Sequence, residues 1–313
     1  MTRLKAWALT PTALVFISWV IVLAVSQAML GTVVTPQNLT TIVALSSTTI
    51  ITGVGFTITM VAGVFDLSVG SAMMITGVVA GTLALKDVPL FLAMPSAVVL
   101  GAAIGATNAF LVTKLRINPI IATLGMLFAL KGAGQLIGGG RGTQVLDPTF
   151  RFARDDFLGL PIPIFIMAVV VIVGHYLLAY TALGRRITAV GDNAVGAREV
   201  AINVERYRVY ALIICGALAG LSGLIVTSIL GATDAQQSVG REIDVATAAF
   251  LGGAALAGGR GSVIATSIAV LLLATLYNVF IQLNVRPEFV QVVSGALLVL
   301  AVAFNTRPSG GYK

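Results

Sequence analysis

The sequence predicts an all-α integral membrane protein that forms a single transmembrane domain over residues 1–313. Of these residues, 58% are hydrophobic and only 10% are charged, and the mean hydropathy is +1.01. A soluble domain carries roughly 25% charged residues, so this chain has too little polar surface to fold in water. Its apolar stretches recur at about the 20 residues that a helix needs to cross roughly 30 Å of hydrocarbon. The 34 glycines fit a bundle of such helices, because glycine lets helix backbones approach closely in lipid.

Hydropathy along the chain predicts about ten spanning helices. The expected spans lie near residues 7–30, 40–62, 67–85, 89–113, 118–137, 161–182, 208–231, 244–258, 262–282 and 288–304. The first stretch is too long for the apolar core of a secretory signal, so we expect it to remain as the first span. The stretches that begin near 67 and 244 are the weakest, because the former follows a charged residue and the latter is short.

Positive charge is distributed unevenly between the connections. If the N-terminus is cytoplasmic, the segments on that side carry 12 basic and 4 acidic residues, against 7 basic and 8 acidic residues outside. Because Lys and Arg concentrate on the cytoplasmic side of membrane proteins, we expect both termini there. Two polar connections are long, 138–160 outside and 183–207 inside, and contacts with soluble partners are expected on them. The basic residues are scattered between apolar stretches, which does not favour nucleic-acid binding.

The inside connection, residues 183–207, predicts a short helix along the cytoplasmic surface. A Gly-Asp-Asn turn signal at 191–193 precedes an Ala-rich stretch that continues to Ile202. Asp192 or Asn193 can cap this helix by accepting hydrogen bonds from its first backbone amides. The helix would present a shallow face for another protein, made of the small residues Ala194, Gly196, Ala197 and Ala201. The alternative is a basic loop that only fixes topology, and composition alone favours that alternative.

A second polar segment, residues 63–71, places Asp66 with the hydroxyls of Ser68 and Ser71 between two apolar stretches. Ionisable groups close to hydrocarbon are costly and usually face a cavity or a partner. Asp66 can cap the following helix or hydrogen-bond a polar solute. Capping is favoured, because Asp just before a helical run is a common N-cap. We therefore expect Asp66 and the nearby Gly70 to be structural.

A glycine-rich segment, Leu251–Ser262, predicts a tight reversal between two closely packed helices. Its structural glycines are Gly252, Gly253, Gly258 and Gly259. Neither this segment nor residues 138–142 contain the Lys-Ser or Lys-Thr that ends a phosphate-binding loop. We therefore expect no ATP site in this chain.

Residues that carry chemistry are too few for catalysis. His175 is the only histidine and Cys215 the only cysteine, which rules out a metal site built on histidines and a thiolate cluster. Ser222 has no nearby base in the sequence, and nothing resembles a nucleophile elbow. The sequence therefore predicts that this chain has no catalytic residue, no metal and no cofactor, and that it is not an enzyme.

Four motifs resemble the permease subunits of ribose-type ATP-binding-cassette sugar importers, a bacterial family that includes xylose, galactose and autoinducer-2 permeases. The motifs are Asp66-Leu67-Ser68-Val69-Gly70, the NPIIATLG run at 118–125, the inside loop at 184–204, and Leu251–Ser262. They follow the family's order and span nearly the whole chain. The resemblance implies a ten-helix permease fold shared with vitamin B12-type importers. It also implies import of a pentose, hexose or related polyol across the bacterial inner membrane.

The same resemblance implies several partners. They are a second permease chain, identical or different, two cytoplasmic ATPase subunits that bind ATP and Mg, and a periplasmic or lipid-anchored sugar-binding protein. The inside loop corresponds to the coupling helix that docks on the ATPase. The docking residues would be Asp192, Asn193, Ala194, Gly196, Ala197, Arg198, Glu199 and Ile202. Residues 201–203 read Ala-Ile-Asn where the family usually has Ser-Gly-Ile or a similar triplet, which leaves the identity of the ATPase open.

The expected transport path is lined by neutral, small or hydroxylated side chains, because tight binding inside a path slows release. Candidates for this path are Thr48, Thr52, Ser68, Ser71 and Asn108. Two other classes stay open. A secondary transporter shares the helix number and glycine content but predicts buried acidic or histidine pairs, which the spans mostly lack. A membrane-embedded enzyme needs a nucleophile or metal constellation, for which only Asp66 and His175 are candidates.

Overall fold

The fold is known from a computed structural model that describes residues 10–86, 88–139, 142–145, 147–234 and 240–305. The α-helices are α2 (Pro11–Leu30), α3 (Pro36–Val61), α4 (Val69–Ala84), α5 (Leu90–Thr113), α6 (Pro119–Ile137), α7 (Ile162–Tyr180), α8 (Ala182–Asp192), α9 (Ala194–Glu199), α10 (Val204–Leu230), α11 (Arg241–Leu251), α12 (Val263–Gln282) and α13 (Pro287–Asn305). A 3-10 helix, η1 (Thr149–Arg154), and the short strands β1 (Thr143–Gln144), β2 (Asp156–Phe157), β3 (Leu160–Pro161) and β4 (Ala232–Thr233) complete the described elements.

Each of the ten stretches expected to span the membrane coincides with a helix. Seven of these helices are long and apolar enough to cross a bilayer, namely α2, α3, α5, α6, α7, α10 and α12. The helices α4, with 16 residues, and α11, with 11, are shorter. The span expected near 244–258 is wrong in its bounds, because α11 already ends at Leu251, where the glycine-rich segment begins. The all-α membrane class is confirmed, and the number of about ten spans stays a prediction.

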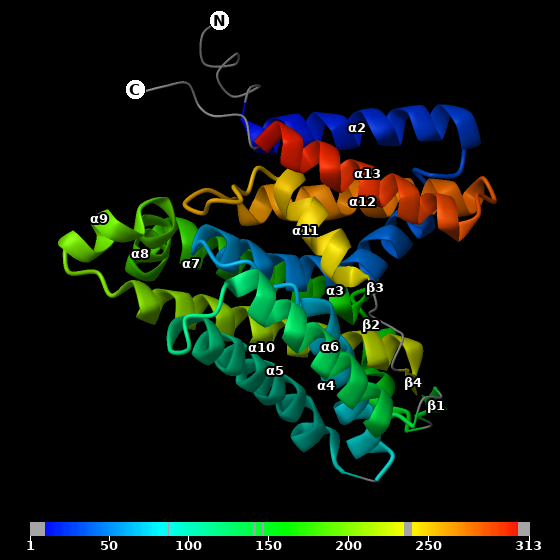
Figure 1. Cartoon of the computed structure of the whole chain (residues 1–313). Coiled ribbons are helices and arrows are strands. Elements are labelled where there is room, and N and C mark those ends of the chain that lie inside the picture. The colour runs from blue at the N-terminus through cyan, green and yellow to red at the C-terminus, as the bar shows by residue number, and fades with distance from the viewer. Residues whose placement is uncertain (1–9, 87, 140–141, 146, 235–239, 306–313) are drawn as a thin grey trace, which may run out of the picture.

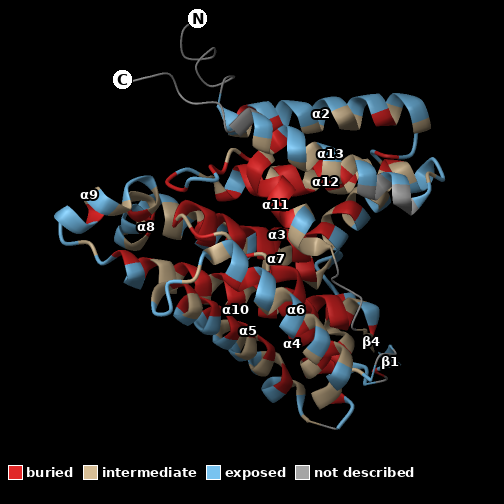
Figure 2. Cartoon of the chain, in the orientation of Figure 1, coloured by how far each residue is buried: buried red, intermediate tan, exposed pale blue. Residues whose placement is uncertain are grey.

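The helices α3 and α10 form the buried centre of the bundle, whereas α2 at its edge is largely exposed (Figure 2). α10 packs against α5 through small residues on both helices. Gly101 and Gly105 of α5 face Gly216 and Gly220 of α10, and a methyl group built on Gly101 would meet the Gly216 carbonyl oxygen. Both pairs are spaced as Gly-x-x-x-Gly, the spacing that lets two helix backbones touch in a membrane. The glycine content therefore serves helix packing, as expected from composition.

The two ends of the bundle differ. The short helices α8 and α9 form one end, and α2 begins and α13 ends near it (Figure 1). At the other end, β1 pairs antiparallel with β4, with Thr143 opposite Thr233. There the guanidinium of Arg154 donates to the carbonyl oxygens of Ile229 and Leu230 at 2.6 and 2.8 Å and so satisfies the last carbonyls of α10.

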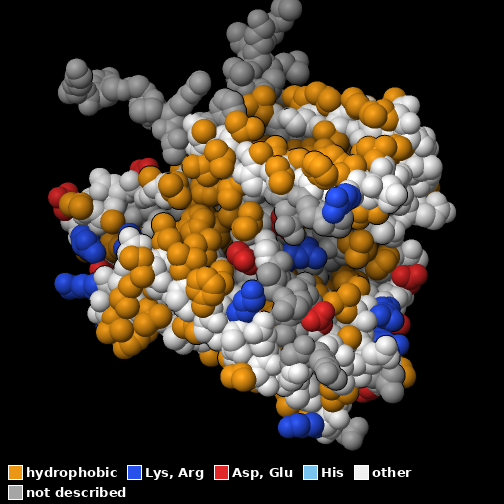
Figure 3. Space-filling model, turned by 45° about the vertical axis from the view of Figure 1, so that its right-hand side comes forward, with side chains coloured by type: hydrophobic (Ala, Val, Ile, Leu, Met, Phe, Trp, Pro, Cys, Tyr) orange, Lys and Arg blue, Asp and Glu red, His pale blue; other side chains and the backbone are white. Residues whose placement is uncertain are grey.

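Apolar side chains cover much of the outer surface of the bundle. On α7, Val169, Ile172, Val173 and Tyr176 are all more than half exposed. Figure 3 shows one face of the molecule, on which apolar side chains form broad areas and charged ones are few, some near the middle and others at the left, right and lower edges. Contiguous apolar surface of this kind is rare on soluble proteins and fits contact with lipid.

Candidate functional site

The long inside connection folds into two helices rather than one. The Thr181 hydroxyl oxygen accepts from the Gly184 amide at 3.1 Å and caps α8. α8 is amphipathic, because Ile187 and Val190 are buried while Arg185 and Arg186 are exposed. The expected helix from Ala194 to Ile202 is therefore only partly correct. α9 ends at Glu199, and Ala201, with φ of 59°, breaks the helical backbone.

Asn193, and not Asp192, caps α9. Its side-chain oxygen accepts from the amides of Val195 at 3.1 Å and Gly196 at 2.9 Å. Asp192 is instead the last residue of α8, where it lies against the backbone of Gly259. The sequence left both residues open as caps, and the structure selects Asn193 because its side chain reaches two otherwise unpaired amides.

The outward face of α9 is not the face of small residues expected from the sequence. Ala197 is buried at 5% exposure and packs with Val190, Val204 and Tyr207 in the protein's own core. Ala194, Gly196 and Ile202 are half-buried. From Ala194 to Ile202 the exposed residues are Val195, Arg198, Glu199, Val200 and Ala201, and the two valines are 66% and 69% exposed. Of the residues named for docking, Asp192, Asn193, Arg198 and Glu199 are thus exposed, together with two valines that were not named.

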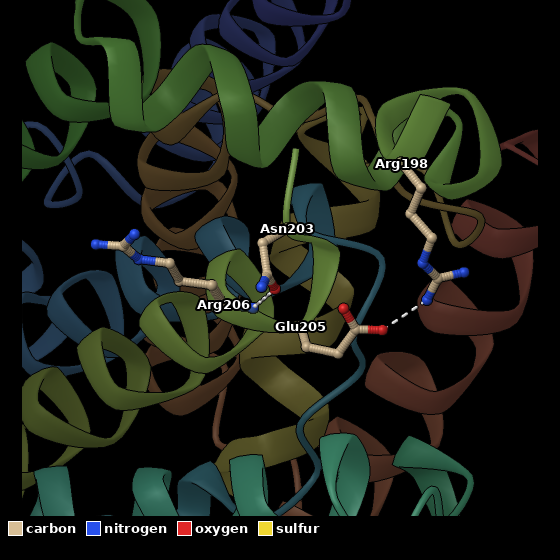
Figure 4. Close-up of polar contacts among 4 residues, drawn as sticks. All are labelled: Arg198, Asn203, Glu205 and Arg206. Carbon is tan, nitrogen blue, oxygen red and sulfur yellow. Dashed lines mark hydrogen bonds and ion pairs between the residues drawn. The ribbon is translucent and has the colours of Figure 1, made fainter. Parts of the chain in front are cut away.

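An ion pair fastens α9 to the start of α10 (Figure 4). Arg198 Nη2 lies 2.6 Å from Glu205 Oε1, and both side chains are about half exposed. The side-chain oxygen of Asn203 accepts from the Arg206 amide at 2.9 Å and caps α10 (Figure 4). An exposed ion pair of this kind stabilises by about 0–1 kcal/mol, and burial of the Ala197 methyl group contributes a similar amount, so both hold α9 in position.

The glycines of the segment Leu251–Ser262 bring it against the α8–α9 loop. Gly258 and Gly259 have φ of 94° and 74°, and the Gly259 amide donates to the Val61 carbonyl at 3.0 Å. A side chain on Gly191 would collide with the Val61 carbonyl oxygen. The end of α3, the end of α8 and this segment therefore touch backbone to backbone. The predicted tight reversal is confirmed, with Gly252 ending α11 and Gly253 at φ of 85° starting the turn.

Asp66 lies in the turn between α3 and α4 and is 2% exposed. Its Oδ1 accepts from the Ser68 amide at 2.9 Å, from the Ser68 hydroxyl at 2.7 Å and from the Asn108 side-chain amide at 3.3 Å. The expected cap is wrong in detail, because α4 begins only at Val69 and has no side-chain capping bond. Asp66 orders the turn and joins it to α5. Gly70 has a different role, since a side chain there would collide with the Glu242 carboxylate.

The five side chains expected along the transport path lie inside the subunit. Their exposed fractions are 2% for Thr48, 0% for Thr52, 1% for Ser68, 7% for Ser71 and 0% for Asn108. Ser68 and Asn108 hydrogen-bond each other at 2.7 Å, and the Thr52 hydroxyl donates to the Thr48 carbonyl at 3.1 Å. The hydroxyls of Thr52 and Ser68 and the Asn108 side-chain N–H therefore contact the protein's own helices, whereas Asn108 Oδ1 has no hydrogen-bond partner among the described residues. That they line the path stays a prediction.

A mainly apolar pocket with a few polar groups, which the sequence did not reveal, lies between α3, α11 and α12, and Arg241, Asp244 and Tyr277 line it. The sequence held one sign of this pocket, namely the opposite charges of Arg241 and Asp244, three residues apart before the glycine-rich segment. We assigned these two residues to an outer connection. Within the described residues, no group of three or more His, Cys, Asp and Glu side chains is arranged to hold a metal ion.

The apolar bundle defines a multi-pass membrane protein. The family described as "Branched-chain amino acid transport system / permease component" matches residues 38–302, and the chain belongs to this family. It is 33% identical over 308 residues to the ribose import permease protein RbsC of Escherichia coli strain K12, covering 97% of this chain and 95% of that protein. It is 32% identical over 292 residues to the D-allose transport system permease protein AlsC of the same strain, covering 91% and 89%.

A third relative is the L-arabinose ABC transporter permease protein AraH of Azospirillum brasilense, 31% identical over 274 residues, or 87% of this chain and 80% of that protein. No solved structure matches the chain. The resemblance to sugar importer permeases, inferred from four short motifs, is thereby confirmed.

Proposed function

We propose that the chain is the membrane permease of an ATP-binding-cassette importer that moves a monosaccharide or related small polyol into the cytoplasm. The observation that carries this proposal is similarity along nearly the whole chain to permeases named for ribose, allose and arabinose. The matched family is named for amino-acid transport, so a branched-chain amino acid is the second candidate solute.

The end of the bundle formed by α8 and α9 is the cytoplasmic end in this proposal. Exposed arginines support the orientation, namely Arg185, Arg186, Arg198 and Arg206. The opposite end carries the exposed acids Asp155 and Asp156. The exposed Arg154 beside these acids leaves that end with nearly balanced charge. Basic residues concentrate on the cytoplasmic side of bacterial membrane proteins, so both termini would lie in the cytoplasm and the opposite end outside the inner membrane.

The proposed assembly pairs this permease with a second permease chain and two cytoplasmic ATPase subunits, and an external binding protein delivers the solute. The ATPase would dock on α8 and α9. ATP and Mg would bind to the ATPase and not to this chain. Close backbone contact between α8, α3 and the segment Leu251–Ser262 supports this role, because movement of the loop would pass directly to the membrane helices. Ten spanning helices and the vitamin B12-importer-like fold are part of the same proposal, with α4 and α11 as short spans.

Uptake by the complete complex tests the proposal. The permease, its ATPase and its binding protein are reconstituted in proteoliposomes, and uptake of radiolabelled ribose, allose, arabinose and leucine is followed with and without ATP. ATP-dependent uptake of at least one of the sugars is expected. Uptake of leucine alone would replace the sugar by an amino acid, and uptake that follows an ion gradient without ATP would favour a secondary transporter.

A further inference from the structure

A pocket of about 270 Å³ opens between α3, α11 and α12. Its polar lining comprises Ser46, Thr49, Arg241, Asp244, Tyr277 and Asn278. Apolar side chains such as Val270 and Leu273 form the rest of the wall. A concave, mainly apolar site with a few convergent polar groups is the usual form of a small-molecule site.

The two charged groups of the pocket do not pair with each other. The guanidinium of Arg241 donates to the Thr49 hydroxyl oxygen at 2.8 Å, and Asp244 Oδ1 accepts from the Tyr277 hydroxyl at 2.7 Å. Within the described part of the chain, the one ion pair is that of Arg198 with Glu205, far along the bundle. A guanidinium has five N–H donors and a carboxylate has two acceptor oxygens, so hydrogen-bonding capacity remains on both sides of the pocket.

The pocket lies in the half of the bundle away from α8 and α9. Ser46 and Thr49 lie near the middle of α3, and Tyr277 and Asn278 lie in the last turns of α12, near the loop from α2 to α3. Asn278 and Asn38 exchange hydrogen bonds of 2.9 and 3.1 Å there, which fixes the Asn278 amide at the pocket wall. Ionisable groups beside spanning helices are costly and usually mark a solute path or a partner.

We propose that this pocket contacts the transported solute, a neutral polyhydroxyl compound of monosaccharide size, as it enters the permease from outside. This proposal rests on the proposed function of an importer. A sugar hydroxyl donates to the Asp244 carboxylate and accepts from the Arg241 guanidinium, while a C–H face of the ring packs on Leu273. One cation and one anion give the lining no net charge, which suits a neutral solute.

A zwitterionic amino acid would also meet one cation and one anion. The hydroxyls of Ser46, Thr49 and Tyr277 and the Asn278 amide are already hydrogen-bonded within the protein, but their oxygens can accept a further hydrogen bond, which a polyol offers and an aliphatic amino-acid side chain does not. The composition of the lining therefore favours a polyol.

The test uses the complete complex in proteoliposomes with the permease variants Asp244→Asn and Arg241→Gln. The asparagine keeps an oxygen that can accept from Tyr277, so the local fold is preserved while the charge-assisted bond to the solute is lost. About tenfold lower uptake of the sugar that the wild-type complex carries is expected, with normal membrane abundance and normal co-purification of the ATPase. The ratio of ribose to allose uptake should also change, because pocket contacts differ between the two sugars.

Ser294→Ala is the matched control. Ser294 Oγ lies 2.6 Å from the Tyr277 hydroxyl but does not line the pocket. This variant therefore removes a hydrogen bond to Tyr277 without changing a residue of the pocket wall. Normal uptake and an unchanged sugar ratio are expected for it. If Asp244→Asn transports like the wild type, or if it and Ser294→Ala lower all sugars in the same proportion, the pocket is structural and the importer assignment stands. If the wild type carries only leucine, or no solute with ATP, both the pocket proposal and the sugar importer fail.

Discussion

Gly101 of α5 and Gly216 of α10 pack so closely that a methyl group on either would meet the carbonyl oxygen of the other. Both residues are buried at the main helix pair of the bundle. In lipid, apolar side chains gain little free energy when they leave the lipid tails and contact another helix. Close packing of this kind is therefore a principal source of helix association.

Gly101→Ala is therefore expected to lower the stability of the protein, although alanine favours a helix by about 0.5–1 kcal/mol over glycine. Overpacking of this kind costs typically about 1–3 kcal/mol. The melting temperature in detergent reports the loss. Gly132→Ala on α6 is the control, because a methyl group there meets no atom within 4 Å and should leave stability equal or slightly higher. Equal melting temperatures for the two variants would contradict the close contact.

Asp66→Ala should destabilise the protein more than Asp66→Asn. Alanine leaves the Ser68 amide and the Asn108 side chain without their buried acceptor, at a cost of about 1–3 kcal/mol, whereas asparagine retains an oxygen in the same place. Melting temperature, membrane abundance and uptake are measured side by side, with Asp155→Ala at an exposed position as the control. Normal abundance with no uptake in Asp66→Asn would show that the charge itself acts in transport.

Val195→Glu and Val200→Glu should weaken binding of the ATPase by about tenfold or more while the permease stays folded. Both valines are exposed on the loop that we assign to docking, and a carboxylate at a buried apolar contact carries a desolvation cost. Co-purification of the ATPase is the measurement, and Val34→Glu, exposed in the connection from α2 to α3, is the matched control. Full co-purification with both loop variants would place the ATPase elsewhere.

Ala197→Trp tests the corrected face of α9. Because Ala197 is buried among Val190, Val204 and Tyr207, the indole cannot fit and the variant should lose thermal stability before it affects docking. A stable variant that fails only to bind the ATPase would restore the small-residue face expected from the sequence.

Thiol labelling checks the orientation of the bundle. With a membrane-impermeant maleimide, Asn193→Cys should react only in inverted vesicles and Asp155→Cys only in intact cells or spheroplasts, since both positions are exposed at opposite ends. The native Cys215 is fully buried and should give no background. Pro308, a third position suited to the cytoplasmic label, lies outside the described residues. Labelling of Asp155→Cys from the cytoplasmic side would reverse the topology.

The sequence by itself determined the membrane class, the approximate positions of the long apolar helices and the family. These follow from local properties, because the length of an apolar run and the presence of the four short motifs are decided residue by residue along the chain. The sequence also predicted part of the helix capping. Asn193 was one of two adjacent candidates, and only the position of the amides it reaches distinguished it from Asp192.

The tertiary structure alone decided which side of each helix faces the protein. A buried position in a membrane bundle and a lipid-facing one are both apolar or small, so composition does not separate them. Ala197 therefore looked like part of a docking face, although it is buried in the subunit. Arg241 and Tyr277 are 36 residues apart in the chain, and only the packing of α11 against α12 brings them to one pocket.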